Sequence, residues 1–169
     1  KKIKKQIELL KKNESTNIVG VFGGYNLIYS NGKVMKTVLK KERKYIFDEI
    51  FLHNFDLPAP TALLKLEYAR AVGGYTENLK IEDWYMWLKL TEKGNTLVYL
   101  NEILIYYRSH SSNASKNLKI MNQEREKVID YFTYHHLYND ANLKVQWLKT
   151  TDYNYINKFK ALKLLWPII

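Results

Sequence analysis

The sequence predicts an α/β fold, a mixed sheet with packed helices, and three observations lead to this class. An apolar, β-branched run at residues 18–29 has the composition of a strand. Asn31-Gly32 follows it, a dipeptide typical of a type I′ hairpin, so the next run is expected to return antiparallel. Gly94 ends an apolar helical stretch at residues 82–93 and leads into a further strand, so helices and strands alternate.

The remaining elements follow from hydrophobic period and from chain breakers. Helices are expected where apolar residues recur every three or four positions, at residues 1–12, 44–55, 67–72, 82–93, 116–136 and 143–166, the last with a break near Asp152. Strands are expected at residues 18–29, 33–39, 61–65, 97–99 and 103–107. Apolar residues expected to share a helix face are Ile3, Ile7 and Leu10, and then Ile46, Phe47, Ile50 and Phe51. Gly73-Gly74 marks a turn that needs positive φ.

Composition narrows the class of protein. The chain has 169 residues, of which 46% are hydrophobic, and this length suits one domain or a piece of a larger one. It contains no cysteine, which excludes a disulfide scaffold and a cysteine nucleophile. The net charge of +10 lies at the two ends, because residues 45–115 carry 6 basic and 9 acidic side chains. Of 27 basic residues 23 are lysine, whereas specific readers of nucleic acid favour arginine, so we expect no nucleic-acid partner.

Two adjacent acids, Glu82 and Asp83, open the predicted helix at residues 82–93. Unpaired N–H groups and the positive end of the helix dipole favour ionised carboxylates there, so the pair is expected to stay available as a base near neutral pH. Such a carboxylate can accept the proton of a hydroxyl nucleophile. The alternative is that both acids only cap the helix.

Three further side chains have the chemistry of a ligand site. Trp84 can stack on a sugar or pack in the core. Arg108 and His110 follow the last predicted strand, where a guanidinium can grip a diphosphate and an imidazole can ligate a divalent cation. The alternative for His110 is a surface or hydrogen-bonding residue.

The order and spacing of these residues resemble the C-terminal half of the family 2 glycosyltransferases, which have the GT-A fold. The matching motifs are Val72-Gly73-Gly74-Tyr75, Glu82-Asp83-Trp84, Trp87-Leu88-Lys89-Leu90 and Tyr106-Tyr107-Arg108-Ser109-His110, with Asn113 and Ser115 after them. The resemblance covers residues 1–115 and implies the acceptor-side half of such a domain. Residues 116–169 are then a helical C-terminal extension.

The resemblance implies an inverting transfer of a sugar from a nucleotide-sugar donor to a hydroxyl of a polysaccharide, glycan or lipid-linked acceptor, in bacterial cell-surface glycan synthesis. Asp83 takes the place of the family's base, and Glu82 shapes the acceptor site beside it. Arg108 and His110 fall where the family holds the donor diphosphate and its Mg²⁺ or Mn²⁺, and Trp84 flanks the sugars. Three residues are expected to line the cleft, namely Thr61, Gly73 and Gly74.

The sequence departs from the family in one respect. It contains no Asp-x-Asp, the form of the family's metal motif. We therefore expect the chain to be a fragment of a longer enzyme, beginning after that motif and inactive alone.

A hypothesis from a different class is a non-catalytic basic module that binds an anionic membrane surface or nucleic acid. It is supported by the lysine-rich residues 1–12 and by residues 159–166, where lysines alternate with leucines before Trp166. No apolar run reaches the ~18 residues of a membrane span. We expect a cytoplasmic protein that can also contact the inner face of the cell membrane peripherally.

Overall fold

The computed structural model describes residues 2–13, 15–110 and 117–156. Its helices are α1 (Lys2–Lys12), α2 (Phe47–Phe51), α3 (Leu66–Ala71), α4 (Glu82–Thr91), α5 (Leu118–Asp130) and α6 (Tyr138–Ile156), with a 3₁₀ turn η1 (Ala59–Thr61). Its strands are β1 (Ile18–Ile28), β2 (Val34–Val38), β3 (Arg43–Tyr45), β4 (Leu63–Leu64) and β5 (Thr96–Arg108). The predicted α/β class is therefore confirmed.

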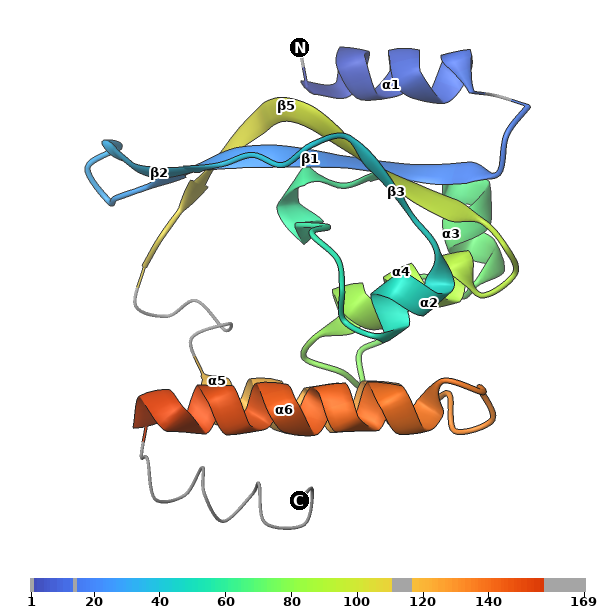
Figure 1. The fold of residues 1–169 in the computed structure, drawn as a ribbon. Helices are drawn as coiled ribbons and strands as arrows, with labels where there is room; N and C mark the ends of the chain where they lie inside the picture. The colour runs from blue at the N-terminus through green and yellow to red at the C-terminus, as the bar shows by residue number, and fades with distance from the viewer. Residues whose placement is uncertain (1, 14, 111–116, 157–169) are drawn as a thin grey trace.

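The strands form one mixed sheet in the order β2-β1-β5-β3, and β4 also pairs with β1. β1 and β5 are parallel, whereas the other strand pairs are antiparallel. Figure 1 shows α1 over one face of this sheet and α2 and α4 beneath the opposite face. α5 and α6 lie side by side in a further layer beyond α2 and α4.

The core lies between the sheet and α4. Trp87 of α4 is fully buried, and its ring meets that of Phe22 from β1 edge-on, with ring centroids 4.8 Å apart. Phe132, which follows α5, is 1% exposed and packs against Phe47 and Phe51 of α2. The described part of the helical extension thus shares one hydrophobic core with the sheet.

Helix α1 packs on the sheet with a polar residue inward. Gln6 is fully buried, and its Nε2 donates to the carbonyl oxygens of Val21 and Thr61 at 2.8 Å each. Ile3 and Ile7, which share the apolar face, are instead 58% and 39% exposed. Interior carbonyl groups need a donor, and the glutamine amide supplies it to two of them.

The helix expected at residues 44–55 begins later and is shorter. Tyr45 is extended because β3 pairs with β5, and Ile46 precedes the helix as its N-cap, 48% exposed rather than inward. The other three expected core residues are buried, namely Phe47, Ile50 and Phe51. The chain leaves the helix at His53, whose φ of 56° is left-handed.

Three strand predictions need correction. Of the strand expected at residues 61–65 only Leu63–Leu64 is extended in the sheet, because Thr61 ends the 3₁₀ turn η1. β1 and β2 form the expected hairpin, but within its loop only Gly32 has positive φ, so the turn is not type I′, which needs two such residues. β5 runs unbroken through residues 96–108, where two strands were expected, because its register against β1 shifts between Gly23 and Gly24 and takes up the extra residues.

The last helices also differ from expectation. α5 is shorter than the predicted stretch at 116–136, and α6 begins at Tyr138 and continues past Asp152 without a break. Residues 159–166 and 111–116, with Asn113 and Ser115, lie outside the described residues. In the part of the chain that the structure describes, no helix has the length and apolar content needed to cross a bilayer.

Candidate functional site

Asp83 lies in the first turn of α4, and most of that helix is buried. Trp84, Trp87 and Leu88 are each 3% exposed or less. Side chains packed at interior density hold a helix in one position, so the carboxyl group at its start has a rigid support. The Oδ1 atom of Asp83 accepts a hydrogen bond of 2.7 Å from the backbone N–H of Trp84.

The pKa of Asp83 is raised, although a helix start was expected to favour the ionised form. Burial is the largest cause and the charge of Glu82 adds to it, while the N–H of Trp84 acts in the opposite direction. The desolvation cost of the charge therefore exceeds the benefit of the hydrogen bonds. A carboxylate with a raised pKa is a stronger base, which suits Asp83 to proton transfer near neutral pH.

Tyr75 is a further candidate for the site, to which the sequence reasoning assigned no role of its own. Its pKa is raised first by burial and then by the charges of Asp83 and Glu82. Its ring meets that of Trp87 edge-on at 6.2 Å between centroids, yet the residue is 51% exposed. A solvent-accessible phenol thus lies close to two carboxylates. The only sequence signal for it is its place at the end of Val-Gly-Gly-Tyr.

Gly73 and Gly74 place this tyrosine. Their φ angles are 87° and 72°, as the predicted turn requires. A Cβ atom on either residue would meet nothing within 4 Å, so the backbone conformation, and not close packing, calls for glycine here. These two residues follow α3 and reverse the direction of the chain, so that the ring of Tyr75 contacts Trp87 of α4.

Trp84 is used by the core. It is 3% exposed, and its Nε1–H donates to the backbone oxygen of Ile50 at 2.9 Å. The rings of His53 and Phe55 lie against it, with centroids at 4.8 and 6.4 Å. The indole therefore presents no open face on which a sugar could stack, and of the two uses considered for it the structure supports core packing.

Thr61 is likewise buried in the fold. Its Oγ1 accepts a hydrogen bond of 3.2 Å from the N–H of Gly23 and donates one of 2.7 Å to the oxygen of Pro58. The side chain is fully buried, so it ties the loop of residues 57–61 to β1 instead of lining a cleft.

Arg108 and His110 lie at the end of β5. The guanidinium of Arg108 donates through Nη1 to the backbone oxygens of Tyr29 at 3.1 Å and Ser30 at 2.6 Å, which fixes it to the β1–β2 loop. Among the described residues, no three His, Asp or Glu side chains are grouped so that they could hold a metal ion. The divalent cation implied by the resemblance thus lacks a ligand set in this part of the chain, and we derive no step through it.

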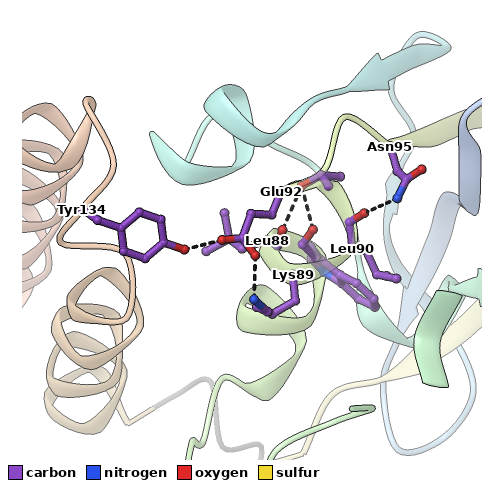
Figure 2. A network of polar contacts seen from close by, with 8 residues as sticks. Leu88, Lys89, Leu90, Glu92, Asn95 and Tyr134 are labelled. Atoms are coloured by element: carbon purple, nitrogen blue, oxygen red, sulfur yellow. Dashed lines mark hydrogen bonds and ion pairs between the residues drawn. The ribbon is translucent and has the colours of Figure 1, made fainter. Parts of the chain in front are cut away.

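A polar network anchors the far end of α4 (Figure 2). The carboxylate of Glu92 accepts hydrogen bonds from Lys89 Nζ at 2.6 Å and from the hydroxyl of Tyr134. Burial is the largest single influence on the pKa of Glu92 and would raise it, but the two hydrogen bonds and the charges of Lys89 and Lys93 together lower it. The hydrogen bond to Glu92 raises the pKa of Tyr134 to about 12. The network joins α4 to the segment after α5 and leaves Asp83 at the opposite end.

A comparison of the chain with models of known protein families and with curated proteins finds no match. Function has to be argued from the residues themselves. The structure brings Tyr75, Glu82 and Asp83 into one electrostatic group, whereas Arg108 contacts a different part of the chain.

Proposed function

We propose that the chain is the acceptor-side half of an inverting nucleotide-sugar glycosyltransferase in which Asp83 is the catalytic base. The observation that carries the proposal is the carboxyl group of Asp83, held at the start of a buried helix with its pKa raised by burial. The order of the surrounding motifs, which resembles family 2 glycosyltransferases, supports the same assignment.

In the proposed reaction Asp83 takes the proton of the acceptor hydroxyl as that oxygen attacks the anomeric carbon of the donor. The new C–O bond forms on the face opposite the leaving group, the bond from the anomeric carbon to the diphosphate oxygen breaks, and the configuration inverts. The electron pair of that bond leaves with the nucleoside diphosphate. In this proposal Tyr75 orients the acceptor, because the charges of Asp83 and Glu82 are close enough to raise the pKa of its phenol.

The test is Asp83→Asn in an enzyme that contains both this chain and an Asp-x-Asp half. Transfer is expected to fall by about 10²–10⁴, the usual effect of losing a general base, while donor binding persists. Asp48→Asn is the matched control, because Asp48 also lies in the first turn of a helix and its side chain is 47% exposed. Transfer at the wild-type rate by Asp83→Asn would refute the assignment.

A second candidate, peripheral binding to an anionic membrane, is favoured by α1. This helix carries five lysines and one glutamate in 11 residues, and it exposes Ile3 and Ile7. An interfacial helix combines the same features, apolar side chains that enter the bilayer surface and cations that meet its phosphates. Binding to a membrane is compatible with transfer to a lipid-linked acceptor.

In flotation with vesicles of phosphatidylserine and phosphatidylcholine, we expect Ile3→Glu with Ile7→Glu to abolish binding. Leu143→Glu is the control, since Leu143 is 54% exposed on a different helix. Equal flotation of the wild-type protein and the double variant would contradict a membrane role for α1.

A further inference from the structure

A hollow of about 510 Å³ lies between α1 and β5, and we call it the α1–β5 hollow. Charged side chains line it from the helix and apolar ones from the strand, namely Lys2, Lys4, Lys5 and Glu8, and then Ile103 and Leu104. Ligand pockets have volumes of about 300–1,000 Å³ and combine an apolar surface with a few charged or polar groups. The α1–β5 hollow has both properties.

The apolar side of the hollow depends on an irregularity in the pairing of β1 with β5. Consecutive residues of a regular strand point to opposite faces of a sheet, yet both Ile103 and Leu104 line the hollow. The register between the two strands shifts on both sides of Gly24, which changes the direction of the side chains locally. A Cβ atom on Gly23 would lie 2.7 Å from Cδ1 of Leu104, and one on Gly24 would lie 3.0 Å from Cδ1 of Ile103. Glycine at these two positions therefore lets both apolar side chains pack closely on β1.

The charged side of the hollow is positive. Three ammonium groups and the carboxylate of Glu8 line it, and Glu102, which pairs with Lys5 at 2.7 Å, adds a second carboxylate beside it. Three cations against two anions leave a net charge of +1 among the described residues. A neutral ligand would leave this charge uncompensated, whereas an anion balances it.

The lysines can reach an anion because their present contacts are weak or incomplete. Lys4 lies 3.9 Å from Glu8, and the two side chains are 78% and 61% exposed. An ion pair exposed to this extent contributes little, so the ammonium group can turn to a stronger anion at small cost. Nζ of Lys2 donates to the backbone oxygen of Pro60 at 3.0 Å, which uses one of its three N–H groups. Both lysines therefore have donors to offer in the hollow.

We propose that the α1–β5 hollow binds an amphiphilic phosphate monoester, whose phosphate contacts the lysines and whose alkyl chain packs on Ile103 and Leu104. A phosphate monoester has three terminal oxygens that accept hydrogen bonds and carries a negative charge, so it matches three ammonium groups. Removal of CH₂ groups from water onto an apolar surface favours an alkyl chain over a free phosphate ion.

This binding depends on neither of the functions proposed for the chain. α1 covers the face of the sheet opposite to α4, so the hollow is separate from Asp83 (Figure 1). Ile3 and Ile7, the residues expected to enter a bilayer surface, do not line it. Only the interpretation of the amphiphile as an anionic membrane lipid rests on the peripheral membrane binding proposed for α1.

The test is isothermal titration calorimetry on the 169-residue chain at low salt, with octyl phosphate below its micellar concentration. We expect octyl phosphate to bind, and Lys4→Gln with Lys5→Gln to weaken its affinity by about tenfold or more, because charge-assisted hydrogen bonds are lost. Lys11→Gln with Lys12→Gln is the matched control, since it removes the same charge from the other end of α1, and neither residue lines the hollow. Circular dichroism checks that each variant is folded.

Two further probes separate the charged head from the chain. Inorganic phosphate is expected to bind about tenfold more weakly than octyl phosphate or worse, because it lacks the alkyl chain. Octyl glucoside, which has the same chain and a neutral head, is expected not to bind. Binding of either probe as tightly as octyl phosphate would overturn the proposal, and so would equal affinity of the wild-type protein and the Lys4→Gln, Lys5→Gln variant.

A variant of the isoleucine face distinguishes this proposal from the membrane function. Ile3→Gln with Ile7→Gln is expected to bind octyl phosphate like the wild-type protein, because both side chains lie outside the hollow. If this variant floats with vesicles as the wild-type protein does, the membrane role of α1 is refuted while binding of octyl phosphate still supports the hollow. Loss of octyl phosphate binding in this variant would overturn the site as described.

Discussion

The orientation of α1 gives the sharpest test of the fold, because the sequence pattern and the structure disagree about which face is buried. Replacing Gln6 by Met keeps the length of the side chain and removes both of its hydrogen bonds, to Val21 and Thr61. Each neutral hydrogen bond contributes about 1 kcal/mol, so the loss is about 2 kcal/mol. The substitution has two further effects of opposite sign. It leaves the carbonyl groups of Val21 and Thr61 without this donor, which costs stability, and it removes Gln6 Oε1, which is buried without a hydrogen-bond partner in the described structure. We take these two effects to cancel, so the expected loss stays at about 2 kcal/mol.

The assay is thermal unfolding followed by circular dichroism at 222 nm. For a chain of this size 1 kcal/mol corresponds to about 2–4 °C, so Gln6→Met is expected to lower Tm by about 4–8 °C. Gln123→Met is the control, because Gln123 is an exposed helical glutamine of α5. Its Tm should match that of the wild-type protein.

Substitutions on the opposite face complete the test. Ile3→Gln and Ile7→Gln are each expected to change stability by less than about 0.5 kcal/mol, since both side chains are exposed. If the isoleucine face were the one packed on the sheet, each change would cost about 1.5–3 kcal/mol. A wild-type Tm for Gln6→Met together with large losses for the isoleucine variants would refute the packing described here.

Two further predictions concern pH. Burial raises the pKa of Asp83, so above the unfolded aspartate pKa of 3.8 the ionised carboxylate lowers the stability of the folded protein. Asp83→Asn should therefore raise Tm at pH 7, by an increment that shrinks as the pH is lowered toward 4. A lower Tm for this variant at pH 7 would contradict the prediction. Burial lowers the pKa of His53 from 6.5 to about 4. The free energy of unfolding, measured with urea, should therefore fall by about 3 kcal/mol as the pH is lowered from above 6.5 to below 4. His53→Asn tolerates the left-handed backbone and removes the titration, so its stability should vary less with pH; an unchanged pH dependence would refute the role of His53.

Much of the fold was predictable where the signal is local. The positive φ of Gly73 and Gly74 follows from the absence of a Cβ atom, and Gly94 has the left-handed conformation expected at the end of α4. The buried face of α4 follows from its density of apolar residues. The errors occur where a distant strand competes with helical propensity, as at Tyr45, whose pairing with β5 keeps it extended.

The candidate site was predictable in part. The sequence singles out Glu82 and Asp83, since two acids at a helix start form a local pattern. It does not predict that burial would outweigh the helix start in setting the pKa of Asp83, because burial depends on chain segments far away in sequence. For the same reason it cannot tell that the indole of Trp84 is enclosed by His53 and Phe55.

The sequence by itself therefore determines the α/β class, the apolar helix that starts with Glu82 and Asp83, and the glycine turn before it. These features follow from the hydrophobic period and from the backbone freedom of glycine, which both act over a few residues. Only the tertiary structure decides that Gln6 and not Ile3 is buried, and that the charge of Asp83 is close enough to Tyr75 to raise the pKa of its phenol. These outcomes depend on which groups from distant parts of the chain are buried next to one another, away from water. A local sequence pattern does not contain that information.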